Sequence, residues 1–145
     1  MDTVRITKIF KFEMGHALVG YDGKCANIHG HSYRLEVTLI GQPEKNPDSA
    51  KLGMVLDFSD LKNVINKEVI DRLDHALVLK EEDRRAELLT AEENLILVPY
   101  QPTCENLLID IIHRIQMPLS KLAKLYSVIL HETATSKAAW YATDN

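Results

Sequence analysis

The sequence has no hydrophobic run that approaches the roughly 18 residues needed to span a bilayer, and no cluster of basic residues. With 17 Lys and Arg against 21 Asp and Glu, its net charge is -4, which argues against a nucleic-acid partner. It has only two cysteines, Cys25 and Cys104, and no apolar targeting segment at its start. We therefore expect free thiols, a reducing cytoplasmic location and no membrane association.

The chain has the composition of a single globular domain spanning residues 1–145. Hydrophobic residues make up 46% and charged residues 26%, and no internal repeat or low-complexity segment interrupts them. A chain of this length buries a sizeable core. One domain is therefore the expected organisation.

Periodicity predicts the secondary structure. Alternating or short apolar runs predict strands at 4–14, 31–40, 54–56, 94–98 and 126–133, with a turn-rich hairpin tip at 41–52. Segment 57–60 offers an N-cap for an amphipathic helix through Leu73, and Thr103 caps a second helix that Pro118 ends. The charged stretch 80–93 suggests a short, solvated helical excursion. The order predicts an α+β fold with helices on one face of a largely antiparallel sheet.

The most informative pattern is His16-x8-Cys25-x3-His29-Gly30-His31. Residues two apart on a strand share a face, so His29 and His31 are expected to point at one place, and His16 ends a neighbouring alternating run. Three His ligands leave a fourth position open on Zn²⁺, as in catalytic sites. The alternative is three polar residues at a sheet edge. The spacing favours metal binding.

Cys25 lies in the loop between the histidines and allows two interpretations. As a fourth ligand it would close the site and make the zinc structural. As a thiolate beside the metal it would act as a nucleophile or base. The spacing alone does not decide between them.

Two further polar groups are candidates for acid–base or binding roles. Asp74 and His75 follow the first predicted helix, where a carboxylate can orient an imidazole; an exposed helix end is the alternative. Glu132 alternates with Leu130 and Val128 and should lie on the apolar face, where it needs a partner. It would suit two adjacent N–H donors of a heterocycle, or a salt bridge to Lys or Arg.

The chain resembles the family of 6-pyruvoyltetrahydropterin and 6-carboxytetrahydropterin synthases from about residue 5 to 140. The motifs that carry the resemblance are His16, Cys25-x3-His29-Gly30-His31, Asp57-Phe58, Leu73-Asp74-His75, Pro102-Thr103-x-Glu105-Asn106 and Glu132-Thr133. The short gap between Cys25 and His29 is similar to that of the carboxytetrahydropterin branch. The stretch from His75 to Pro102 is longer than in compact members of the family.

This resemblance implies a tunnelling fold, in which a four-stranded antiparallel sheet with two helices assembles into a trimeric or hexameric barrel. It implies three site functions, with residues as follows. Zn²⁺ would be held by His16, His29 and His31. Proton transfer would involve Cys25 as base, together with Asp74, His75 and Glu132. The pterin would contact Glu132, Thr103 and Glu105.

The implied reaction is that of a lyase. A 6-carboxy-5,6,7,8-tetrahydropterin synthase would convert 7,8-dihydroneopterin triphosphate with release of triphosphate and acetaldehyde, in queuosine or other deazapurine synthesis. Two alternatives remain at this point. One is a 6-pyruvoyltetrahydropterin synthase with the same ligands; the other is a non-catalytic binding module whose zinc is structural.

Overall fold

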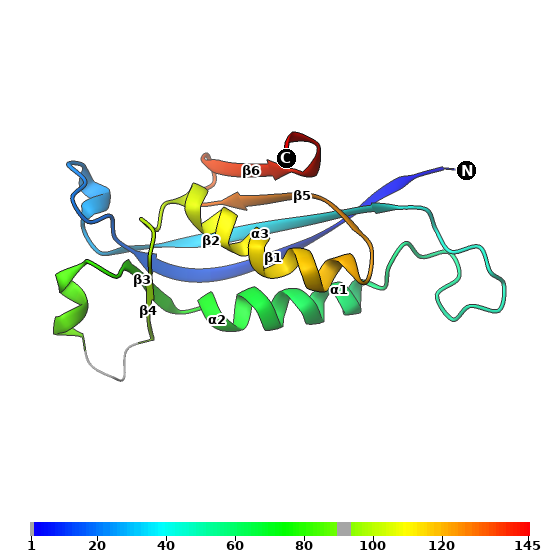
Figure 1. Ribbon diagram of the computed structural model, residues 1–145, viewed down its shortest axis with the longest axis horizontal. Helices are drawn as coiled ribbons and strands as arrows, with labels where there is room; N and C mark the ends of the chain where they lie inside the picture. Colours follow the sequence, from blue (N-terminus) through cyan, green and yellow to red (C-terminus); the bar gives the residue numbers. More distant parts are fainter. Residues whose placement is uncertain (1, 90–93) are drawn as a thin grey trace.

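A computed structural model describes residues 2–89 and 94–145 as one mixed sheet with helices against one of its faces (Figure 1). The strand order is β4-β3-β1-β2-β5-β6. The α+β class and the single helical layer confirm the sequence prediction. The sheet itself differs, with six strands in place of four and two parallel pairs.

The longest strands are β1 (Val4–His16) and β2 (His29–Gly41), an antiparallel pair aligned from Val4 opposite Gly41 to His16 opposite His29. Alternation along β1 buries Phe10, Phe12 and Met14 toward the helices. Both strands run further than predicted. The extra residues bring the histidines into the paired region, so the sheet itself fixes their spacing.

The sequence prediction missed two strands. β3 (Ala76–Lys80) pairs in parallel with β1 and with β4 (Leu95–Val98), and β6 (Lys137–Tyr141) pairs antiparallel with β5 (Lys124–His131). β3 is an apolar run of a few residues without clear alternation, a pattern that does not separate strand from helix. The predicted strand at 54–56 was wrong. That segment is irregular and bends at Val55 and Leu56, directly after a turn at 51–53; backbone hydrogen bonds join Glu44 to Gly53 and Met54.

The first helical stretch runs through α1 (Phe58–Ile65), the π-helical η2 (Asn66–Ile70) and α2 (Asp71–Leu73). Asp57 is its N-cap, because its Oδ1 accepts from the Ser59 N–H at 2.9 Å. α3 (Cys104–Ser120) is capped by Thr103, as predicted, but continues past Pro118. A proline in the last turn removes one helical hydrogen bond without ending the helix.

The charged excursion after β3 contains a 3₁₀ turn, η3 (Arg84–Leu88), in agreement with the predicted short helical segment. The rest of that prediction, residues 90–93, lies outside the described residues. Among the described residues, no helix combines the length and apolar character needed to cross a membrane.

The core lies between the sheet and the helices and supports a stability prediction. Ile115 on α3 is fully buried, whereas Ile109 on the same helix is 47% exposed. We expect Ile115→Ala to lower the free energy of unfolding by about 2–5 kcal/mol, from lost burial and the cavity left behind. Urea unfolding at one fixed protein concentration measures this. Ile109→Ala is the matched control, with an expected change of about 0.5 kcal/mol or less; equal losses would contradict the packing described here.

Candidate metal centre and active site

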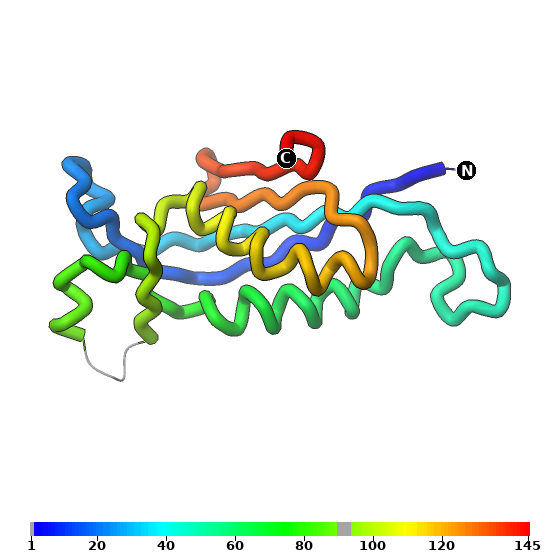
Figure 2. Tube along the Cα trace, viewed as in Figure 1, coloured from blue at the N-terminus to red at the C-terminus, as the bar shows by residue number. Residues whose placement is uncertain are grey.

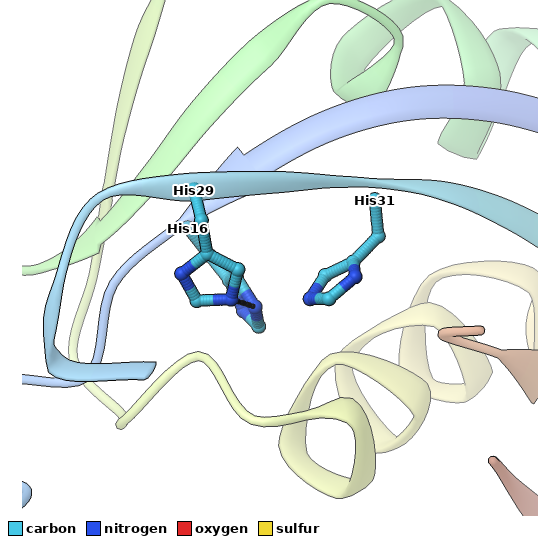
Figure 3. A group of neighbouring side chains, drawn as sticks. All are labelled: His16, His29 and His31. Carbon is cyan, nitrogen blue, oxygen red and sulfur yellow. Dashed lines mark hydrogen bonds between the residues drawn. The ribbon is translucent and has the colours of Figure 1, made fainter. Parts of the chain in front are cut away.

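Three imidazoles converge on the helix-facing side of the β1–β2 pair (Figure 3). The ring centroids of His16, His29 and His31 lie 4.6, 5.1 and 4.8 Å apart in the pairs 16–29, 16–31 and 29–31. One nitrogen from each ring belongs to a set within 4.8 Å of one another. The structure therefore brings together the three residues that the sequence proposed as metal ligands.

Backbone carbonyls orient two of the rings. Nδ1 of His16 donates to the Pro102 carbonyl and Nδ1 of His29 to the Asn27 carbonyl, both at 2.7 Å. Since a carbonyl only accepts, each Nδ1 carries the proton and each Nε2 keeps a lone pair. The two Nε2 atoms face each other at 3.0 Å. Two lone pairs at that distance repel unless a cation lies between them, and a carbonyl on the other ring nitrogen is the usual support of a metal-binding histidine.

The third imidazole adds an independent observation. Nε2 of His31 is buried and makes no hydrogen bond in the described part of the chain, although the Glu132 carboxylate lies 3.4 Å away. Such orphaned buried nitrogens are rare in native proteins. Together, the three imidazole nitrogens fit Zn²⁺, which favours this ligand.

Burial favours the metal-binding form of His16 and His31. Desolvation is the main reason that the pKa values of these two residues lie below the usual histidine value. The hydrogen bond to the Pro102 carbonyl opposes this shift at His16, the charge of Glu132 opposes it at both residues, and His29 reinforces it. A neutral imidazole is the form that coordinates a metal.

Glu132 reaches the same place from the end of β5. Its Oε1 lies 3.3 Å from Nε2 of His16 and 3.4 Å from Nε2 of His31. The alternation argument thus placed the carboxylate on the correct face. Its partners among the described residues are the two imidazoles, in place of the Lys or Arg that was the alternative.

Cys25 lies in η1 (Lys24–Ala26), exposed and unpaired in the loop between β1 and β2. Its carbonyl accepts from the Leu18 N–H at 3.0 Å. The thiol is not part of the converging ligand set of the described residues, which favours a role other than ligation. Cys104, by contrast, is buried; its Sγ donates to the Leu130 carbonyl at 3.4 Å, and burial raises the pKa of this thiol to about 11.

Asp74 and His75 form a pair at the junction of α2 and β3. Asp74 Oδ1 accepts from the Glu13 N–H at 2.9 Å and lies 3.1 Å from Nδ1 of His75. The His75 backbone is left-handed, with φ at 65°, and its side chain is 78% exposed. It is not one of the converging ligands, but with His31 it lines a hollow of about 370 Å³. The predicted pair therefore exists, and it faces solvent in a single chain.

Thr103 and Glu105 lie at the start of α3. The Thr103 hydroxyl accepts from the Asn106 N–H at 3.2 Å, which makes it the helix cap, and Glu105 is exposed in the first turn. These positions are structural facts; the contact with a pterin that the resemblance implies stays a prediction.

The sequence prediction missed Tyr33. Its ring lies edge-on to His16 and His31, with centroids 6.3 and 5.6 Å away, and its buried hydroxyl has no partner in the described residues. Desolvation, followed by the charge of Glu132, raises the pKa of this hydroxyl. The signal was present, since Tyr33 continues the period of two that starts at His29 and His31. Tyr33 therefore forms part of the wall around the three imidazoles.

Sequence comparisons relate this chain to known proteins. The sequence profile of a family described as 6-pyruvoyl tetrahydropterin synthase matches residues 5–143. A Haemophilus influenzae protein named 6-carboxy-5,6,7,8-tetrahydropterin synthase is 37% identical over 137 residues, 91% of this chain and 94% of that protein. A Drosophila melanogaster protein named 6-pyruvoyl tetrahydrobiopterin synthase is 35% identical, over 77% of this chain and 57% of its own.

Comparison with solved structures finds the same fold in related proteins. The structure of Caenorhabditis elegans 6-pyruvoyl tetrahydropterin synthase superposes with a TM-score of 0.73 at 25% identity, over 98% of this chain and 97% of that one. An uncharacterized protein from Wolinella succinogenes reaches a TM-score of 0.77 at 21% identity, covering 98% and 99% of the two chains. Those solved structures share the sheet and the helical layer described above.

Proposed function

Because this chain belongs to the 6-pyruvoyl tetrahydropterin synthase family, we propose that it is a zinc-dependent 6-carboxy-5,6,7,8-tetrahydropterin synthase. The observation that carries the proposal is the convergence of three histidine nitrogens, on a chain that aligns nearly end to end with a protein of that name. The substrate is 7,8-dihydroneopterin triphosphate. With one water consumed, the lyase releases triphosphate and acetaldehyde and leaves the 6-carboxylated pterin.

The metal would be held by Nε2 of His16 and Nε2 of His29, which keep their lone pairs, and by His31. When bound, zinc supplies Lewis acidity toward the hydroxyl groups of the substrate side chain. The carbonyls of Pro102 and Asn27 hold two of the rings in place. The chain thus provides an oriented set of ligands.

Proton transfer falls to Cys25 and to the pair Asp74–His75. Cys25, exposed in its loop and outside the ligand set, acts as general base in its thiolate form, and becomes a thiol when it takes a proton from the substrate side chain. His75, oriented by the Asp74 carboxylate at 3.1 Å, returns a proton at another atom. Such a division of labour suits a reaction that both removes and adds protons.

Pterin binding falls mainly to Glu132. Its second carboxylate oxygen and the rest of its acceptor capacity suit the adjacent amino and N3–H donors of the pterin ring. Since Glu132 already lies beside two imidazoles, a pterin held there would keep its side chain near the metal. Thr103 and Glu105 border the pocket in this proposal.

We further propose a homo-oligomer, a trimer or hexamer, with active sites between subunits. The exposed His75 supports this, because a second chain would bury it and complete the acid–base set. The outer strands β4 and β6 support it as well, since unpaired sheet edges invite pairing with another copy. A free Cys25 thiol suits a reducing cytoplasmic location. The proposed product would serve queuosine or other deazapurine synthesis.

Product analysis tests the function directly. We expect the zinc-loaded protein to convert 7,8-dihydroneopterin triphosphate into acetaldehyde and 6-carboxytetrahydropterin, detected by mass spectrometry. The chelator-treated protein is the control and should form neither. A 6-pyruvoyl product would instead assign the sister activity, which the family profile and the Drosophila relative favour as the second candidate. No turnover with zinc bound would support a non-catalytic zinc module and contradict the proposal.

A further inference from the structure

Two segments that are distant in sequence lie at the same end of the sheet, as the trace in Figure 2 shows: the loop 17–28, which carries Cys25, and the excursion 81–89 after β3. Parallel pairing of β3 with β1 causes this. It aligns Val78 with His16, so the chain leaving β3 emerges beside the chain leaving β1. The excursion is therefore a neighbour of the loop that holds the proposed general base.

A single guanidinium joins the two segments. Nε and Nη2 of Arg85 donate to Oδ1 and Oδ2 of Asp83 at 2.9 and 2.7 Å. The remaining nitrogen, Nη1, donates to the backbone carbonyl of Ala26, the residue directly after Cys25. All three nitrogens of the Arg85 side chain are thus engaged.

Asp83 keeps the guanidinium in this orientation. It is only 3% exposed, and its Oδ1 also accepts from the Arg85 N–H at 3.0 Å, which makes it the cap of η3. The hydrogen bond from Arg85 is the main reason that the pKa of Asp83 is lowered. A planar guanidinium held by a bidentate carboxylate has little freedom left, so its third nitrogen points in a fixed direction.

The first half of the loop has a different support. The Gln101 side chain pairs with both backbone groups of Val19, accepting from its N–H at 3.2 Å and donating to its carbonyl at 2.8 Å. The second half, beyond Cys25, meets Arg85. Cys25 therefore lies between two anchors, one from the β3–β4 connection and one from the segment between β4 and α3.

We propose that Asp83 and Arg85 form a clamp that sets the position of Cys25, with Arg85 as a positioning residue for the reaction. This inference rests on the proposed function, in which Cys25 is the general base. A base must come within hydrogen-bond reach of its proton, and a misplacement of about 1 Å can cost about 100-fold in rate. A clamp on the next residue is well placed to prevent such a shift.

Steady-state kinetics test the role in catalysis. We expect Arg85→Ala to lower kcat about 10- to 100-fold while KM stays within about threefold, because the groups proposed to bind the pterin are elsewhere. Arg85→Lys should fall between Arg85→Ala and the wild type, since an ammonium lacks the fork that meets carboxylate and carbonyl together. Arg84→Ala, an exposed neighbour in the same turn, is the matched control and should leave kcat unchanged. A kcat of Arg85→Ala within twofold of this control would overturn the proposal.

Proteolysis tests the clamp independently of activity. Lysyl endopeptidase cleaves after Lys24, which lies next to Cys25, only when the loop opens. We expect cleavage there to be about ten times faster in Arg85→Ala than in Arg84→Ala, because a hydrogen bond from a charged donor is lost. Equal rates would overturn the clamp. If Arg85→Ala is cleaved faster but the wild-type protein shows no turnover, the proposed function is refuted and the clamp is still supported.

In Arg85→Ala the buried Asp83 carboxylate loses its partner, which could destabilise the fold by itself. A double variant separates this effect from the loss of the clamp. Asp83→Ser with Arg85→Ala removes both members, so no unpaired charge stays buried. We expect the same fall in kcat, with zinc content and unfolding temperature close to those of the wild type. A parallel loss of zinc, unfolding temperature and kcat would assign the pair to fold stability and overturn the positioning role.

Discussion

Replacing Cys25 with alanine is expected to lower kcat at least about 100-fold, and up to about 10⁴-fold, while zinc stays bound. The reason is geometric. The converging ligand set contains three imidazole nitrogens and no thiol, and Cys25 is exposed in a loop outside it. Removing the thiol should therefore remove a proton acceptor and leave the metal ligands in place. Steady-state kinetics with 7,8-dihydroneopterin triphosphate and elemental analysis of zinc measure the two effects separately.

The second cysteine provides a control for this experiment. Cys104→Ala removes a buried thiol at the first residue of α3, where it donates to the Leu130 carbonyl. It should cost some stability and leave kcat within a few-fold of the wild type. If Cys25→Ala lost zinc and unfolded earlier, Cys25 would be a fourth ligand and the site a closed, structural one. Full activity in Cys25→Ala would instead point to chemistry that needs no thiol.

The second large effect is expected at a metal ligand. Losing a residue that only supports a metal ligand typically weakens metal binding about 10–100-fold. His29→Ala removes a ligand itself, so it should weaken zinc binding by more than this and abolish turnover. His29 suits the test because its ring is only half-buried, so its loss leaves no large core cavity, unlike that of the buried His16. Zinc per chain after dialysis and the rise in unfolding temperature on adding zinc measure the effect. That rise follows from metal binding to the folded state.

His113→Ala is the matched control, since it removes an exposed imidazole on α3 that lies outside the ligand set. We expect it to keep both the zinc content and the thermal shift of the wild type. A His29→Ala protein that retained one zinc per chain and full activity would contradict the metal centre described here. Loss of zinc in both variants would indicate a general effect of removing histidine and would also contradict it.

Local patterns in the sequence were sufficient for several features. The period of two along β2 placed His29 and His31 on one face, because neighbouring residues of a strand point to opposite sides. Asp57 and Thr103 were recognised as helix caps because their side chains bond N–H groups two or three residues away. The face of Glu132 followed from the same alternation. Each of these depends on interactions within a few residues of chain.

Strand pairing was harder to predict from the sequence. β3 and β6 are strands of five residues, and β3 is an apolar run whose pattern suits either a strand or a helix. Their identity comes from the neighbours they pair with, β1 and β5, which are far away in sequence. The same parallel pairing brings the excursion with Arg85 beside the Cys25 loop. A pattern read along one segment contains no information about these partners.

The sequence by itself determined which side chains are the candidates for metal binding, because identity and spacing put three histidines at the ends of two adjacent strands. Only the tertiary structure decided the tautomer and the burial of these side chains. The proton of His16 sits on Nδ1 because that atom meets the Pro102 carbonyl, 86 residues away, and its pKa is low because the fold buries it. Likewise, Arg85 reaches the carbonyl of Ala26 from 59 residues away. Tautomer, burial and loop position depend on long-range contacts, and only the folded chain makes them.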